Sequence, residues 1–277
     1  GGEATSTTPT LMLNMLVKNE ERHLERTLPK WAKLVDYWII GIDNDNEDGS
    51  EQVIKRHLGH LPGSTVRVSF DGMGPTWTLV VQRGRELYPE ATHGILSDAD
   101  FTPLISSFDR TELDLNCSKH TFDVISSDAT DRRHMDWIYR NIEGARVERR
   151  THQVVQVPPI PGQKHYLKRL TSFRVQEHEG GYQDRLPPRT KHHRYIKLLE
   201  ADLKDMPGDS RTLYYLGQEH LELVGDQAKR DLRRQGERSS VVKALRYYRA
   251  RALLPPPGVA QRRSVDEERY WAYLKSA

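Results

Sequence analysis

LMLNMLVKNEERHLERTLPKWAKLVDYWIIGID, residues 11–43, is the stretch of sequence that decides the fold. Apolar runs stand at both of its ends, and between them Leu24, Leu28, Trp31 and Val35 recur at spacings of three or four residues. A short apolar run is typical of a buried strand, whereas recurrence at this spacing is typical of an amphipathic helix. The stretch therefore predicts a strand, a helix and a second strand.

The same alternation continues to about residue 96. It predicts a helix around Val53 and Leu58, a strand over 65–70, a helix over 76–87 and a strand over 93–96. Strands that alternate with helices favour a mainly parallel sheet with helices on its faces. From Cys117 to about His178 the pieces are strand-like, without long helices, which predicts an antiparallel or mixed extension of the same sheet.

Beyond the Pro187–Pro188 pair the sequence becomes helical. Proline residues separate the helical stretches, as expected of helix breakers. We therefore predict two domains, an α/β domain over residues 1–188 and a helical region over 189–277. The helical stretches cover residues 195–206, 211–224, 240–254 and 265–274.

The charge of the chain is almost balanced, with 42 basic and 39 acidic side chains among 277 residues. This balance does not favour a nucleic-acid partner. No apolar run approaches the roughly 18 residues that a membrane span needs, so we expect no membrane span. Cys117 is the only cysteine, which excludes an intramolecular disulfide and a cysteine zinc cluster.

The N-terminal residues 1–10, GGEATSTTPT, are unlike a signal peptide, and the double glycine resembles a cleavage scar. On that interpretation an upstream segment, including a membrane anchor, has been removed. The compartment is left open between the cytoplasm and a lumen such as that of the Golgi.

Three polar clusters follow three of the predicted strands. They are Lys18 to Glu20 after the first strand, IDNDNEDGS (42–50) after the second, and SDAD (97–100) after the fourth. In parallel α/β sheets ligands bind beyond the carboxyl ends of the strands. We therefore expect these clusters to lie on one rim.

Asp98 and Asp100 are one residue apart, and their repulsion would be relieved by a divalent cation that carries phosphates. Each cluster also has a structural interpretation. The Asp-x-Asp pair fits a solvated turn, Asp48 or Ser50 fits a helix cap, and the residues after Val17 fit a capping arrangement. The joint placement of the clusters after successive strands favours binding.

Residues 11–50 resemble the start of the family 2 glycosyltransferases. That pattern is an apolar strand, Asn-Glu, a helix, a second apolar strand and then Asp-x-x-x-x-Asp-Gly-Ser/Thr. The family's metal-binding Asp-x-Asp follows a later short strand, so the resemblance covers about the first 100 residues. The matching positions are Asn19, Glu20, Asp43, Asp48, Gly49, Ser50, Asp98 and Asp100.

The resemblance implies a GT-A fold, which is a Rossmann-like, mainly parallel mixed sheet. It also implies inverting transfer of a hexosyl or pentosyl group from a nucleotide-diphosphate sugar to an acceptor, with Mn²⁺ or Mg²⁺ as cofactor. The acceptor class stays open between a glycan, a protein and a small molecule. The implied metal ligands are Asp98, Asp100 and His178, and the implied nucleotide-sugar contacts are Asn19, Glu20, Asp43, Asp48 and Asp98.

The segment FDGMGPTWT (70–78) follows the third strand, so the helix that begins near Thr76 is predicted to face the nucleotide. Trp77 would then stack on a ring, or else fill the core. The paired arginines at 132–133 and at 149–150 are candidates for diphosphate binding, or for a solvated face.

Inversion also needs a base. His152 is the first candidate, although related sequences carry His-Glu where this chain has His152-Gln153. The remaining candidates are carboxylates, namely Glu179, Asp184 and Asp136.

The C-terminal region resembles the branch of the family that carries tetratricopeptide-like helices. The shared features are Lys191 and Arg194 leading into LLEADL, followed by LYYLGQEHL. The resemblance implies a packing module that provides a protein contact or an acceptor platform, with residues 226–240 as a basic insertion. An ordinary helical cap is the alternative. The repeat positions are matched by Leu216, Gly217, Ala244, Tyr248 and Pro256.

Two other functions remain. The first is a helical interaction module whose sheet domain is inactive, which Gln153 favours. The second is a nucleotidyltransferase, which would normally open with a glycine-rich phosphate loop. The segment after Val17 has no such loop, and its absence counts against this alternative.

Overall fold

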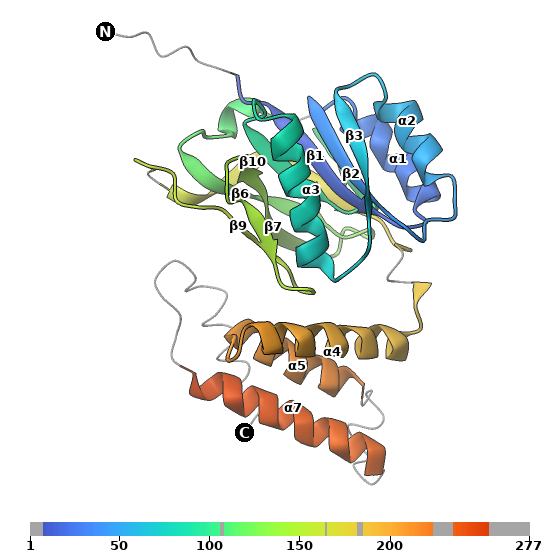
Figure 1. Ribbon diagram of the computed structural model, residues 1–277, viewed down its shortest axis with the longest axis vertical. Coiled ribbons are helices and arrows are strands. Elements are labelled where there is room, and N and C mark those ends of the chain that lie inside the picture. Colours follow the sequence, from blue (N-terminus) through green and yellow to red (C-terminus); the bar gives the residue numbers. More distant parts are fainter. Residues whose placement is uncertain (1–7, 106–107, 164, 182–184, 224–234, 255–277) are drawn as a thin grey trace. The chain divides into compact units, whose positions relative to one another are not determined.

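The computed structural model describes residues 8–105, 108–163, 165–181, 185–223 and 235–254 (Figure 1). The chain forms two compact units, one of Gly1–Glu148 with His152–Arg185 and the other of Arg149–Thr151 with Leu186–Ala277. The predicted domain boundary lies between residues 188 and 189, close to this division. The predicted helix over 265–274, Asp184, Pro256 and most of the basic segment 226–240 lie outside the described residues.

The first unit is built on an eight-stranded sheet with the order β3-β2-β1-β4-β7-β6-β10-β5. β7 and β5 run antiparallel to their neighbours, and the other strands run in one direction. The unit is thus mixed α/β with a mainly parallel sheet, as in Rossmann-like folds. The strands are β1 (Leu11–Val17), β2 (Tyr37–Asp43), β3 (Gly63–Val68), β4 (His93–Ser97), β5 (Phe101–Pro103), β6 (Cys117–Ile125), β7 (Arg132–Arg140) and β10 (His165–Glu177).

Three helices accompany the first strands: α1 (Glu21–Trp31), α2 (Ser50–Leu58) and α3 (Met73–Leu87). β1 is buried on both faces because its side chains alternate between two layers. Leu13 belongs to the same hydrophobic cluster as Leu24 of α1, whereas Met12 belongs to a cluster with Val80 of α3. Figure 1 shows α3 lying across one face of the sheet. The apolar residues that recur at three- and four-residue spacing in the α1 segment therefore lie on the side of the helix that packs on the sheet.

The predicted alternation of strands and helices over the first 100 residues is confirmed, and so is the mixed extension of the sheet after it. One part of the extension is separate: among the described strands, β8 (Arg146–Glu148) and β9 (Val154–Gln156) pair with each other as a two-stranded sheet. The prediction that these segments extend the main sheet is therefore wrong. β8 instead lies beside α3, where Thr78 Oγ1 donates a hydrogen bond to the Val147 carbonyl at 2.9 Å.

The second unit contains α4 (Pro188–Asp205), α5 (Ser210–Glu222) and α7 (Gln235–Leu253), so the predicted helical region is confirmed. α5 packs against both α4 and α7. A Cβ at Gly217 would lie 2.7 Å from the Tyr248 ring, which shows how closely α5 and α7 approach. The buried positions Leu216, Gly217, Ala244 and Tyr248 thus form the contact between two helices. Within the described residues, no helix is sufficiently long and apolar to cross a membrane.

Candidate functional site

The carboxyl ends of the parallel strands place the predicted polar residues along one edge of the sheet. At the end of β2 the buried Asp43 accepts a hydrogen bond from Lys18 Nζ at 3.0 Å, and Asp45 accepts another from the same nitrogen at 3.2 Å. Lys18 follows β1, which is hydrogen bonded to β2. The first two polar clusters are therefore brought together, with one lysine between two carboxylates.

Asn19 and Asp48 connect these two loops. Asn19 Oδ1 accepts a hydrogen bond from the Glu47 amide at 2.7 Å, and the Asp48 carboxylate accepts bonds from the amides of Glu21 (2.9 Å) and Ser50 (3.0 Å). The hydrogen bonds that Asp48 accepts lower the pKa of its carboxyl, although burial acts in the opposite direction and is the largest single influence. Asp48 thus bonds the first amides of α1 and α2, but the N-cap of α2 is Gly49, so the expected capping role of Asp48 or Ser50 is not the one found.

The start of α3 places Thr76 and Trp77 inside the unit. Thr76 Oγ1 donates a hydrogen bond to the Gly72 carbonyl at 2.7 Å and is buried. Trp77 is fully buried in the hydrophobic core, with 0% of its surface exposed. Of the two interpretations of Trp77, the core residue is the one that this position supports, because the side of α3 that carries it is turned toward the sheet rather than the rim.

Asp98 and Asp100 follow β4 and are partly buried. Burial raises the pKa of Asp98, and the neighbouring charges of Asp100 and Glu177 raise it further, against the opposing charge of Arg133. The pKa of Asp100 is raised by burial and by Glu177 and Glu20. Oδ1 of Asp100 is buried and has no hydrogen-bond partner among the described residues. The two carboxylates therefore share a site in which full ionisation is unfavourable without added positive charge.

β7 and β10 border this acidic pair. Arg133, at the start of β7, holds Glu177, at the end of β10, through two hydrogen bonds of 2.7 Å each. The amide of His178 donates to the Asp100 carbonyl at 3.0 Å, and its ring Nε2 lies 2.9 Å from Thr102 Oγ1. The His178 ring thus pairs with Thr102. Within the described residues, no three His, Cys, Asp or Glu side chains are arranged to hold a metal ion, so the predicted set of three metal ligands is not assembled.

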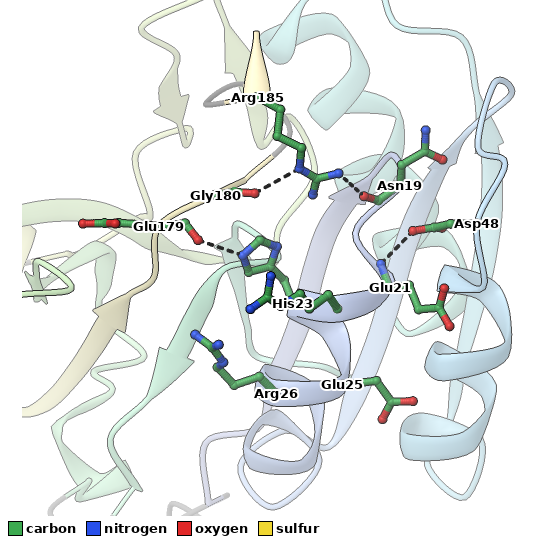
Figure 2. Close-up of a pocket in the computed structure, with 10 residues that line it drawn as sticks. Asn19, Glu21, His23, Glu25, Arg26, Asp48, Glu179, Gly180 and Arg185 are labelled. Carbon is green, nitrogen blue, oxygen red and sulfur yellow. Dashed lines mark hydrogen bonds between the residues drawn. The ribbon is translucent and has the colours of Figure 1, made fainter.

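The segment after β10 is fastened to the loop after β1 through Glu20 and His23. His23 Nδ1 lies 2.8 Å from the Glu20 carboxylate, and His23 Nε2 lies 3.1 Å from the Glu179 carbonyl. Arg185 donates to the Glu20 carboxylate at 2.8 Å. It also donates to the carbonyls of Asn19 and Gly180 at 2.9 and 3.0 Å (Figure 2). Glu20 is therefore engaged inside the protein.

The candidate bases lie in different places. His152 is in the turn between β8 and β9, with a left-handed φ of 50°. Glu179 follows β10 at the acidic edge, where its carboxylate accepts a hydrogen bond from Ser127 Oγ at 3.0 Å. Asp136 pairs with Lys119 in the sheet. Of these three residues, Glu179 is the one whose backbone carbonyl contacts His23 of α1, close to the loop after β1.

The candidate arginines also lie in different parts of the protein. Arg149 pairs with Asp209 at 2.8 Å and Arg150 pairs with Asp202 at 3.1 Å, and these four residues belong to the second unit. Arg132 pairs with Asp123. Arg133, which influences the pKa of Asp98, is the candidate arginine beside the acidic pair.

Sequence reasoning did not identify His23, Glu177 and Arg185 as residues of this edge. Glu20 is the N-cap of α1 and His23 follows three residues later, a spacing at which side chains meet at a helix start, so this pair had a detectable signal. Arg185 is distant in sequence from Asn19 and Glu20, which it contacts, and its place depends on how β10 pairs in the sheet. No local pattern could have indicated it.

Comparisons with known proteins found distant structural similarity and no match in sequence. No protein-family model matches the chain, and no curated protein matches it. Among solved structures, the inositol-1-phosphate CTP transferase from T. maritima is similar over 67% of this chain and 94% of that chain, with 14% sequence identity and a TM-score of 0.34. A TM-score of this size is below the range typical of a shared fold.

Proposed function

We propose that the first unit is a metal-dependent, inverting glycosyltransferase of GT-A type. It would transfer a sugar from a nucleotide-diphosphate sugar to the hydroxyl group of an acceptor. Two features support the proposal. The sheet is mainly parallel, and its acidic and amide side chains gather at the carboxyl ends of β1, β2 and β4, where α/β sheets bind ligands.

The observation that carries the proposal is the state of Asp98 and Asp100. Their pKa values are raised by burial and by neighbouring carboxylates, and Asp100 Oδ1 has no partner among the described residues. A divalent cation fits such a pair, because carboxylate oxygens are its preferred ligands. A third protein ligand is not required, since Mg²⁺ is commonly held by one or two carboxylates together with substrate phosphates and water.

Asp98 and Asp100 would hold the cation, which in this position would neutralise the charge that develops on the leaving diphosphate. Asp43 lies at the end of β2, which β1 separates from β4; its charge is balanced by Lys18, and it is suited to accept hydrogen bonds from the nucleoside. Arg133 and Glu177 would keep the pair aligned from the other side. These roles divide the edge into a nucleoside part at β1 and β2 and a diphosphate part at β4.

The base is proposed to be Glu179 or His152. Glu179 stands at the acidic edge, and Ser127 holds its carboxylate. His152 has an imidazole suited to proton transfer near neutral pH. Replacement of the true base should lower turnover by about 10²–10⁴-fold while donor binding is retained. Glu179→Gln and His152→Ala therefore separate the two candidates, since only one of them should combine intact binding with lost turnover.

The test begins with a screen of nucleotide sugars for slow hydrolysis in the presence of Mn²⁺, with released nucleoside diphosphate as the readout. We expect release by the unmodified chain and none by Asp98→Asn or Asp100→Asn. Asp205→Asn is the matched control, because Asp205 is an exposed aspartate of the second unit.

Two results would overturn the proposal. Consumption of a nucleoside triphosphate instead of release of a diphosphate would indicate a nucleotidyltransferase. Failure to bind any nucleoside diphosphate with or without Mn²⁺ would indicate an inactive interaction module.

A further inference from the structure

A pocket of about 670 Å³ lies beside the first two turns of α1 (Figure 2). Its volume is within the range of small-molecule sites, which is roughly 300–1,000 Å³. The walls come from α1, from the loop before α2 and from the segment that follows β10. The lining residues are Asn19, Glu21, Arg22, His23, Glu25, Arg26, Asp48, Glu179, Gly180 and Arg185.

Arg22 and Arg26 are the two arginines that α1 contributes to the pocket wall. They are exposed, and they are one helical turn apart on α1, a spacing at which like charges repel. Neither arginine has a hydrogen bond or an ion pair with another described residue, and each lines the pocket. The repulsion between the two guanidinium groups is therefore not relieved within the described part of the protein.

The carboxylates of the pocket wall are engaged elsewhere. Glu21 accepts a hydrogen bond from the Gly49 amide at 3.1 Å, and Glu25 pairs with His57 at 2.9 Å and with Arg56. Figure 2 shows that Glu25 and Arg26 extend from α1 in opposite directions. Glu25 thus points toward α2 rather than toward Arg26, and it leaves the positive charge of Arg26 uncompensated.

The other two carboxylates behave alike. Asp48 accepts hydrogen bonds at the start of α2, and Glu179 accepts one from Ser127. Arg185, the third arginine of the wall, is neutralised by Glu20 at 2.8 Å. The lining contains four carboxylates and three arginines, and three of the carboxylates accept hydrogen bonds from neutral groups only, so they keep their charge. Arg22 and Arg26 differ from them because they have no hydrogen bond or ion pair among the described residues.

From this arrangement we propose that the pocket binds the phosphate group of a ligand, held between Arg22 and Arg26. Guanidinium groups bind phosphate oxygens through paired, charge-assisted hydrogen bonds. The pocket is larger than one phosphate, so a phosphate ester fits it better than the free ion. The site is next to the acidic pair: Gly180 lines the pocket, and a Cβ at the following residue, Gly181, would lie 3.0 Å from Asp100 Oδ2.

The site requires neither a cation nor a nucleotide sugar, so it can be tested apart from the proposed transfer reaction. Titration calorimetry of the full chain in EDTA, with glucose 6-phosphate and with inorganic phosphate, would measure binding. We expect Arg22→Ala and Arg26→Ala each to weaken the binding of the ester by at least about tenfold, as the loss of a hydrogen bond to a charged group implies. Arg83→Ala is the matched control, because Arg83 is an exposed helix arginine that pairs with Glu86 outside the pocket.

The two probes distinguish the sources of the phosphate. Tighter binding of the sugar phosphate indicates an ester ligand, and equal binding indicates free phosphate. Equal affinity in the unmodified chain, Arg22→Ala and Arg26→Ala, or no binding at millimolar concentrations, would overturn the proposal. Asp100→Asn is expected to lose sugar transfer. If it still binds phosphate, the phosphate site exists whether or not the proposed transfer reaction does, so the two proposals can be refuted separately.

Discussion

Replacement of Asp100 by asparagine should stabilise the metal-free protein, although most substitutions lower stability. Asparagine keeps the shape of the side chain and removes its charge. Burial, Glu177 and Glu20 raise the pKa of Asp100, so the ionised carboxylate is the less favourable form in the folded state. Its Oδ1 is also buried without a partner among the described residues.

Asparagine still places a polar oxygen at the position of Oδ1, so the magnitude follows from loss of the charge alone. A pKa raised from 3.8 to about 6 disfavours the ionised carboxylate in the folded state by at most about 3 kcal/mol. We therefore expect Asp100→Asn to raise the free energy of unfolding by about 1–3 kcal/mol. Each kcal/mol corresponds to a rise in Tm of about 2–4 °C for a unit of this size.

The sign of the pH dependence provides a second check. A carboxylate with a raised pKa in the folded state contributes stability at low pH, and that contribution is lost as pH rises through the raised value. The gain from Asp100→Asn should therefore be largest near pH 8 and small near pH 4, where the carboxylate of the unmodified chain is protonated. Thermal unfolding followed by circular dichroism in EDTA at the two pH values would measure both.

Asp123→Asn is the matched control. Asp123 is also a buried aspartate, but His134 Nδ1 lies 2.7 Å and Arg169 Nη2 lies 3.2 Å from its carboxylate, and Arg132 pairs with it too. That substitution removes satisfied contacts and should lower Tm at pH 8. If Asp100→Asn lowers Tm in the same manner, Asp100 is a satisfied structural carboxylate and the argument for a cation at this edge is refuted.

Three further results are expected. His120 is fully buried, and burial, followed by the charge of Lys168, lowers its pKa to about 4. A histidine with a lowered pKa in the folded state loses its contribution to stability as pH falls below about 6.5, so between pH 7 and pH 5 the unmodified chain should lose about 2 kcal/mol more of its free energy of unfolding than His120→Gln. Urea denaturation at the two pH values measures this, and equal losses in the two proteins would contradict it. Binding of Mn²⁺ at pH 7 should release protons from Asp98 and Asp100, because their pKa values are raised; calorimetry in two buffers of different ionisation enthalpy measures the release, and identical heats would exclude it. Gly217→Ala should destabilise the second unit by about 1–3 kcal/mol, since its Cβ would lie 2.7 Å from the Tyr248 ring; thermal unfolding should show the loss largely restored in a Gly217→Ala, Tyr248→Leu double variant.

Much of the fold could be predicted because its first half is locally consistent. The apolar runs of β1 and β2 and the recurrence of Leu24 and Leu28 each match the element that forms. β8 and β9 could not be placed, because three-residue strands carry too little pattern to show which sheet they join. Their partner is set by packing against α3, which is a long-range contact.

Only part of the candidate site could be predicted, for the same reason. The strand ends indicated Asp43, Asp98 and Asp100, because the carboxyl ends of parallel strands meet at one edge. The partners of Glu20 could not be inferred, since Arg185 reaches it from the far end of the unit's sequence. The role of Trp77 also depended on which side of α3 faces the sheet, and its neighbours Thr76 and Thr78 give no amphipathic pattern to decide that.

The short antiparallel ladder of β5 and β10 has a consequence for how such a chain can diversify. Phe101 pairs with Glu177, and the His178 amide is bonded to the Asp100 carbonyl, so the chain leaves the acidic edge and returns to it at the same point. The β8–β9 hairpin and its connecting loops lie within that excursion. Insertions or deletions there can change the surface around β8 and β9 while the ladder keeps the two ends of this excursion joined at Asp100 and His178.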